Sequence, residues 1–233
     1  MSDDRGYAHP ELLAETEWLA EHLDDPSVRI VDTGKPEEYG RAHIPNAVHI
    51  GWNYIKDPDN TLHVLPPAKF EELMSSLGIG NDTTVVAYDQ DGAHMAARLW
   101  WVLDYYGHSK VKVLNGGWNK WLKEGRAVTM KTPQFPRARF SAKPNPDKIC
   151  RLDEVKGSIS KPGVVLLDVR SDGEWDGSMP RENKRGGRIP DAVHVEWRKA
   201  VTSDDVMTFR PAAELRKLYE SHGVTPDKQV TTY

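Results

Sequence analysis

The chain has 233 residues and a formal net charge of −4, from 31 lysines and arginines against 35 aspartates and glutamates. This balance excludes the strongly cationic surface that binds nucleic acid or anionic membranes, and no apolar run reaches the roughly 20 residues needed to cross a bilayer. Because there is no secretory signal pattern and the single cysteine, Cys150, cannot form an internal disulfide, we expect a cytoplasmic protein that acts on small molecules or on another protein.

The first half of the chain alternates helical and extended patterns. Apolar residues at helical spacing predict a helix over residues 11–23, and a β-branched run predicts a strand over 28–32 that ends at Asp32. An amphipathic helix is predicted over 67–77, followed by strands over 83–88 and 110–114. This alternation favours an α/β fold with helices on both faces of a parallel sheet, whose ligands bind beyond the carboxyl ends of the strands.

The second half repeats this alternation after a proline-rich stretch. Strands are predicted over 164–169 and 229–233, with a helix over 212–219. Four prolines without apolar periodicity mark residues 127–147 as a linker, which places one domain at 1–126 and another at 148–233. Residues 177–187, rich in glycine and charge, are predicted to form a surface loop.

The two halves are copies of one another. Asp32 and Asp168 lie 136 residues apart, whereas Pro45 and Pro190 lie 145 residues apart, as do Tyr88 and Tyr233. A nine-residue insertion in the second copy accounts for both spacings, and so long a period indicates duplicated domains rather than a solenoid. The first copy continues beyond Tyr88, so we expect the second domain to be incomplete in this chain and to lack a C-terminal segment of the same protein.

The motifs of both copies resemble the rhodanese-type sulfurtransferases. The resemblance rests on a strand ending in Asp, then Glu-aromatic, then Ile-Pro-x-Ala-Val, and on the long segment 96–121 with its Gly-Gly-Trp turn. It implies two rhodanese-like domains, each a parallel sheet with helices on both faces. In tandem members the first domain is usually inert, and the second carries a cysteine directly after the strand tyrosine.

The first-copy loop agrees with the inert half of that family pattern. Gly92 stands where the family motif has glycine, but Asp89 occupies the cysteine position and His94 the arginine position. A carboxylate cannot carry a sulfane sulfur, and neither a metal pattern nor a partnered general acid surrounds Asp89. We expect Asp89 to cap the N-terminus of the following helix.

For the second copy, the resemblance implies a nucleophilic cysteine immediately after Tyr233. That cysteine would take sulfur from thiosulfate or 3-mercaptopyruvate as a persulfide and pass it to cyanide or a thiol, without a metal or organic cofactor. On this hypothesis the 233-residue chain alone lacks the nucleophile. The sequence offers no basis for choosing between the two donors.

Several residues near the predicted loop are candidates for supporting it or for binding the donor. Asp168 and Tyr233 are expected to support the loop. Arg170 either faces the anionic donor or pairs with Asp168, and Arg188 and Arg185 either attract the donor or are simply solvated. Cys150 lies far in sequence from any suitable loop and is assigned a structural role.

Two other functions remain open beside sulfur transfer. A non-catalytic rhodanese-like binding module would have Asp, Ser or Gly after Tyr233, much as the first copy has Asp89. A phosphatase related to the same fold would have a loop one residue longer, ending in arginine. Duplication with one inert copy favours the sulfurtransferase.

Overall fold

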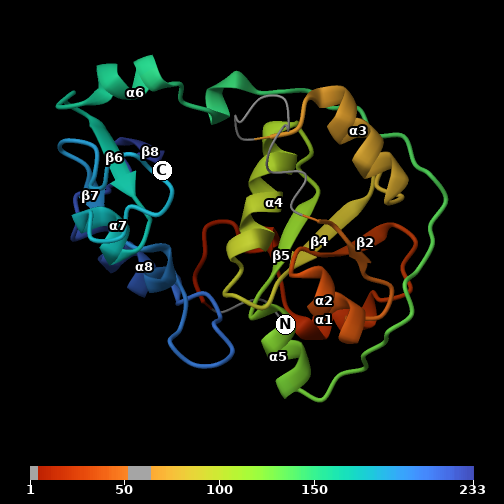
Figure 1. The fold of residues 1–233 in the computed structure, drawn as a ribbon. Coiled ribbons are helices and arrows are strands. Elements are labelled where there is room, and N and C mark those ends of the chain that lie inside the picture. Colours follow the sequence, from red (N-terminus) through yellow and green to blue (C-terminus); the bar gives the residue numbers. More distant parts are fainter. Residues whose placement is uncertain (1–4, 52–63) are drawn as a thin grey trace. The chain divides into compact units, whose positions relative to one another are not determined.

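The computed structural model describes residues 5–51 and 64–233, which form two compact units (Figure 1). The first unit contains His9–Pro146 together with Ser203–Thr208. The second contains residues 5–8, Asp147–Thr202 and Phe209–Tyr233. Each copy of the repeat therefore builds one unit and contributes a short segment to the other. Residues 1–4 and 52–63, which belong to the predicted first domain, lie outside the described part of the chain.

The first unit is built on a parallel sheet of five strands in the order β1-β5-β4-β2-β3. The strands are β1 (Leu13–Ala14), β2 (Val28–Asp32), β3 (Val48–His49), β4 (Thr84–Tyr88) and β5 (Val111–Leu114). The helix predicted over residues 11–23 is wrong in its first half. A 3-10 turn, η1 (Pro10–Leu12), leads into β1, which pairs with β5, and the helix α1 covers only Thr16–Glu21.

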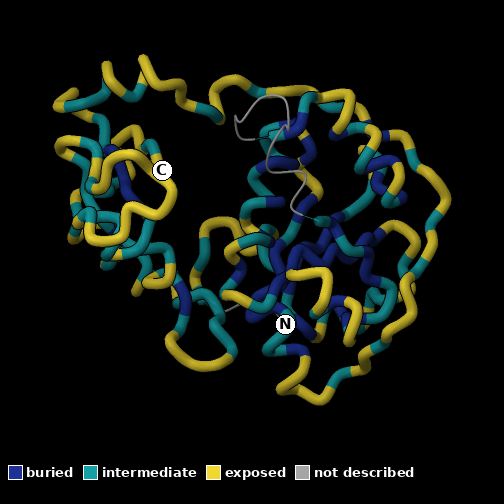
Figure 2. Tube along the Cα trace, in the orientation of Figure 1, coloured by how far each residue is buried: buried dark blue, intermediate teal, exposed yellow. Residues whose placement is uncertain are grey.

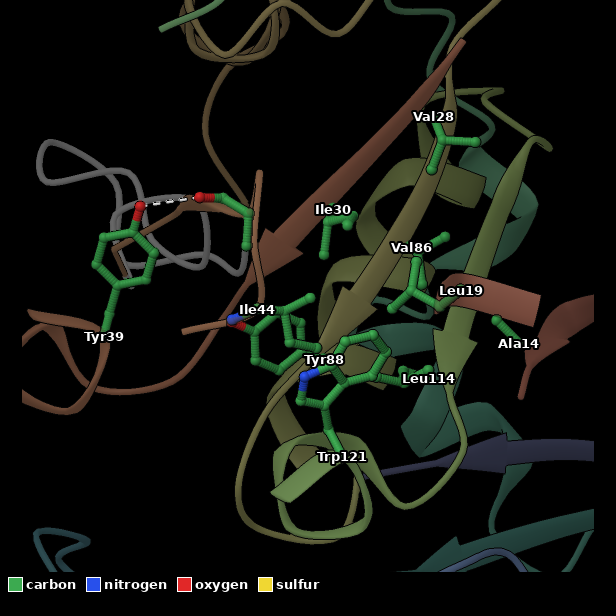
Figure 3. Close-up of a cluster of buried hydrophobic side chains, with 11 residues drawn as sticks. Ala14, Leu19, Val28, Ile30, Tyr39, Ile44, Val86, Tyr88, Leu114 and Trp121 are labelled. Atoms are coloured by element: carbon green, nitrogen blue, oxygen red, sulfur yellow. Dashed lines mark hydrogen bonds between the residues drawn. The ribbon is translucent and has the colours of Figure 1, made fainter. Parts of the chain in front are cut away.

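One face of this sheet carries the main apolar core. Because side chains alternate along a strand, Val28 and Ile30 of β2 point to the same face as Val86 and Tyr88 of β4. Figure 3 shows them meeting Leu19 of α1 and Trp121 of α5. The helices on this face are α1, α2 (Pro36–Arg41) and α5 (Gly117–Lys123).

The other face of the first sheet is covered by longer helices. The helix α4 (His94–Tyr105) packs on β4 and β5, and buries Leu99 and Leu103 completely. Phe70 and Met74 of α3 (Pro67–Ser76) are also fully buried. With helices on both faces, every residue of β2 is buried, which is typical of parallel sheets.

The predicted linker lies against the first unit as extended chain. Thr129 forms an antiparallel bridge with His43, and the Ala138 amide donates to the Ser75 carbonyl at 3.1 Å. Phe140 is 4% exposed and packs edge-on against Phe70. Residues 127–146 are thus anchored along their length, although they contain almost no regular secondary structure.

The second unit has a parallel sheet of three strands in the order β7-β6-β8. Its elements are η3 (Pro146–Lys148), whose first residue is the last of the first unit, α6 (Leu152–Ser158), β6 (Val164–Asp168), α7 (Asp172–Asp176), β7 (Val193–His194), η4 (Trp197–Ala200), α8 (Ala212–Glu220) and β8 (Gln229–Thr232). Figure 2 shows few buried positions here, and within the described residues of this unit the buried apolar side chains are Leu166, Leu167, Val195 and Val201.

The two sheets share one strand register. Asp32 pairs with His49 in the first unit, and Asp168 pairs with His194 in the second. Val28 is opposite Thr84, just as Val164 is opposite Gln229. The strands β2, β3 and β4 therefore correspond to β6, β7 and β8, and the repeat found in the sequence is also a repeat of structure.

Candidate active site

The candidate site in the second unit begins with a buried ion pair at the end of β6. Asp168 is fully buried and accepts a fork of hydrogen bonds from Arg170, with Nη2 at 2.5 Å and Nε at 3.0 Å, and a further bond from the Arg170 amide. Nη2 of Arg170 also donates to the Gly187 carbonyl at 2.9 Å. Of the two roles left open by the sequence, Arg170 therefore takes the pairing one in this structure.

The same carboxylate is in a different electrostatic state in each copy. Burial raises the pKa of Asp168, but the bonds from Arg170 outweigh it, so that the pKa falls below its usual value. In the first copy Gly34 replaces Arg170, and the carboxylate of Asp32 receives the Gly34 amide at 2.7 Å. Desolvation there prevails and raises the pKa of Asp32. Among the described residues, the second copy thus holds a fixed ion pair where the first holds a buried acid without an arginine partner.

Tyr233 lies beside Asp168, directly after β8, the strand that pairs with β6. Its backbone bonds to Leu167 and Val169 continue the pairing of β8 with β6, and its hydroxyl accepts the Ile189 amide at 3.1 Å. The Tyr88 hydroxyl accepts the Ile44 amide in the same way at 3.3 Å (Figure 3). Burial, and then the nearby Asp168 charge, raise the pKa of Tyr233. The tyrosine therefore ties the end of β8 to the turn that follows the inserted loop.

The loop that follows Tyr88 in the first copy directs several backbone N–H groups at one carboxylate. The Asp89 carboxylate accepts four backbone N–H groups, from Asp91 at 2.9 Å, Ala93 at 3.0 Å, Met95 at 2.7 Å and Ala96 at 2.9 Å. The last two belong to the first turn of α4, so Asp89 caps that helix. The loop gathers amide donors around one negative group, which is an anion-binding arrangement.

The backbone of this loop is bent and supported from behind. Gly92 and Ala93 have positive φ values of 62° and 67°, and the Ala93 amide donates to Asp89, while His94 is exposed at the start of α4. Behind the loop, the Trp118 amide donates to the Asp89 carbonyl at 2.9 Å. A Cβ on Gly117 would lie 2.3 Å from that carbonyl oxygen, so the Gly-Gly-Trp turn needs glycine there.

The inserted loop of the second copy, residues 177–187, is closed at its base by glycines. A Cβ on Gly177 would lie 2.9 Å from the Gly187 nitrogen, so the two ends of the loop touch. Arg181 pairs with Glu174 at 2.8 Å, while Glu174 also forms a capping box with Ser171. Arg185 is exposed on the same loop.

Arg188 follows the loop and is held by an aromatic ring. Its guanidinium carbon lies 4.4 Å from the centre of the Trp175 ring, and the His194 ring stacks on Trp175 at 4.8 Å and an angle of 8°. Sequence reasoning missed this stack. The signal was present in the repeat, because Tyr39, His43 and His49 occupy the matching positions. There the Tyr39 ring stacks on His43 and lies tilted at 37° against His49.

Cys150 lies outside the site. It is exposed, and its sulfur is 3.5 Å from the Thr231 hydroxyl of β8. Over residues 5–51 and 64–233, no cluster of His, Cys, Asp and Glu is suited to hold a metal, and no helix is both long and apolar enough to span a membrane.

The duplicated parallel sheets and the capped loop after the strand tyrosine define a tandem rhodanese-like α/β protein. A family model for the rhodanese-like domain matches residues 15–124 and 151–233. The chain belongs to this family and contains the domain twice.

Known proteins resemble the chain over nearly its whole length. A sulfur carrier protein, TtuD, of Thermus thermophilus is 39% identical over 98% of this chain and 84% of its own length. A thiosulfate sulfurtransferase of Corynebacterium glutamicum is 35% identical over 91% of this chain and 74% of its own length. The crystal structure of SseA from Escherichia coli, described as a 3-mercaptopyruvate sulfotransferase, superposes with a TM-score of 0.84 at 27% identity, over 95% of this chain and 87% of that one.

Proposed function

We propose that the protein is a sulfurtransferase that moves a sulfane sulfur from thiosulfate or 3-mercaptopyruvate to cyanide or a thiol. The proposed nucleophile is a cysteine directly after Tyr233. The observation that carries this proposal is the loop around Asp89, where four amides meet on the group that follows the matching tyrosine. A thiolate in an equivalent loop would be stabilised by the same donors, and the thiolate is the reactive form of cysteine.

The proposed reaction with thiosulfate has two displacement steps. The thiolate attacks the outer sulfur of thiosulfate, a new S–S bond forms, and sulfite leaves with the electron pair of the broken bond. Cyanide then attacks the terminal sulfur of the persulfide, and thiocyanate leaves as the thiolate is restored. The loop amides would stabilise the anion at each stage.

Each copy has a separate role in this proposal. Residues 1–126 form an inert domain, because the Asp89 carboxylate already fills its own loop. Residues 127–147 connect the domains, and residues 148–233 form the part of the second domain that prepares the site. There Asp168, held in its ion pair with Arg170, and Tyr233 support the loop, while Arg188 and Arg185 attract the donor. The names of the relatives support this assignment, since they include a thiosulfate sulfurtransferase and a sulfur carrier.

A non-catalytic binding module is the second candidate. The first copy favours it, since Asp89 shows that this fold is stable with its loop filled by a carboxylate. In that case the second copy would also lack a thiol after Tyr233.

Thiocyanate release from thiosulfate and cyanide by the full-length protein tests the proposal. We expect turnover, and a protein one sulfur atom heavier after thiosulfate alone. Serine in place of the cysteine should abolish both, whereas Cys150→Ser should leave both intact. Turnover that depends on Cys150, or a full-length protein with no cysteine after Tyr233, would overturn the assignment.

A further inference from the structure

Arg188, Trp175 and His194 form a stacked column in the second unit. The Trp175 ring has two stacking partners: the Arg188 guanidinium carbon lies 4.4 Å from its centre, and the nearly parallel His194 ring lies 4.8 Å from it. Nε2 of His194 is 2.8 Å from the Arg170 carbonyl, and its Nδ1 is 3.6 Å from an Asp172 oxygen. His194 is therefore fixed to the sheet, where it belongs to β7. Of the three stacked residues, only Arg188 is exposed.

Arg188 is an uncompensated cation. Among the residues the structure describes, no carboxylate or carbonyl pairs with its guanidinium, whereas Arg170 is bound to Asp168 and Arg181 to Glu174. A guanidinium that rests on an indole face keeps the N–H groups at its edge available for an anion. Stacking also limits the orientations of a side chain that would otherwise move freely in solvent.

The position of Arg188 connects it to the proposed reaction. The next residue, Ile189, donates its amide to the Tyr233 hydroxyl, and Tyr233 directly precedes the proposed nucleophile. The first copy uses the corresponding place differently. His43 is fully buried there, stacks on Tyr39, and is bonded to the Tyr39 carbonyl at 2.8 Å and the Lys131 carbonyl at 3.3 Å. Within the described part of the chain, the second copy therefore has an exposed, unpaired arginine at this position, whereas the first copy has a buried histidine with both ring nitrogens bonded.

We infer that Arg188 is a specificity residue that captures the anionic head of the sulfur donor, and that Trp175 is the positioning residue that holds it. The inference rests on the proposed function and extends it. The donors that suit this arrangement carry a sulfonate or carboxylate group, because their paired oxygens match the two parallel N–H groups of a guanidinium. Arg188 acts on donor binding and takes no part in the displacement itself.

Steady-state kinetics of the full-length protein with thiosulfate and cyanide test this inference. Arg188→Gln should raise the KM for thiosulfate about tenfold and leave kcat within about twofold, because a ground-state contact is lost. Trp175→Leu should raise the KM about threefold, and Trp175→Tyr, which supplies the ring found at Tyr39, should restore it. In the Arg188→Gln background, Trp175→Leu should have no further effect on the KM.

Arg216→Gln is the matched control, because it removes another exposed arginine charge, from α8 of the same unit. Its KM should equal that of the wild type. The inference is overturned if the enzyme is active and Arg188→Gln leaves the KM unchanged, or if Trp175→Leu raises the KM equally with and without Arg188. A full-length protein without any turnover would instead overturn the proposed function, and this inference with it.

Discussion

Asn in place of Asp should have opposite effects at the two matching strand ends. Asp168→Asn should lower the free energy of unfolding of the second unit, because it removes the acceptor of the Arg170 fork. Asp32→Asn should raise the free energy of unfolding of the first unit, because it replaces a buried carboxylate whose pKa is raised by desolvation. The two sites share one strand register, so each serves as the control for the other.

The magnitudes follow from the local contacts. Hydrogen bonds to a charged group contribute about 1.5–3 kcal/mol, but the Arg170 side chain is 27% exposed and regains water when its partner is lost. We therefore expect Asp168→Asn to cost about 1–3 kcal/mol. Asp32→Asn keeps an oxygen for the Gly34 amide and removes the buried charge, which should stabilise the unit by about 1 kcal/mol.

Both effects should depend on pH, with signs set by the pKa directions. The pKa of Asp168 is lowered on folding, so its stabilising effect is complete above the unfolded pKa of about 3.9 and is lost as pH falls through the lower folded value. The pKa of Asp32 is raised, so its penalty is absent below that unfolded pKa and grows as pH rises through the higher folded value. Each difference should be fully developed once the pH lies above both the unfolded and the folded pKa of its aspartate.

Urea unfolding monitored by amide hydrogen exchange can measure the two units separately, because the amides of β2 report on the first and those of β6 on the second. Each substitution should change protection only in its own unit. Equal signs at the two sites, or a difference at Asp168 that persists unchanged below its folded pKa, would show that the Arg170 pair does not control the stability of this strand end.

Three further predictions concern the first unit. Asp89→Asn places an amide group against two of the four loop N–H donors and should cost about 2–4 kcal/mol in urea unfolding, while Asp82→Asn at an exposed site should change little. Gly117→Ala should cost at least about 2 kcal/mol because of the 2.3 Å approach to Asp89, and a cost no larger than that of Gly125→Ala, which has φ 65° but open space, would contradict the clash. Burial lowers the pKa of His108, so the unfolded chain takes up its proton first, and stability should fall as pH drops below about 6.5; calorimetry on His108→Gln should show a flatter dependence.

Most regular elements of the protein could be predicted from local pattern. The strands expected over 28–32, 83–88 and 110–114 are present as β2, β4 and β5, and the helix expected over 67–77 is α3. These segments can be predicted from the sequence because the periodicity of their apolar residues fits a sheet that is buried on both faces. The strand β1 did not, since two residues become a strand only through pairing with Val113 and Leu114, about a hundred residues later.

The duplication also placed the candidate site, because equal spacing aligned Asp168 with Asp32 and Tyr233 with Tyr88. Sequence identified Asp89 as the occupant of the loop and the helix that it caps. It did not give the direction of the amides, which depends on the positive φ values at Gly92 and Ala93 and on the support of Trp118 from another helix.

The sequence by itself thus determined the class of fold, the two copies and the strand ends at which their sites lie, since these depend on composition and spacing along the chain. Only the tertiary structure decided that Arg170 binds Asp168 and that Arg188 rests on Trp175. The two arginines have the same side chain, and the difference between them comes from which carboxylate or ring the folded chain brings within reach.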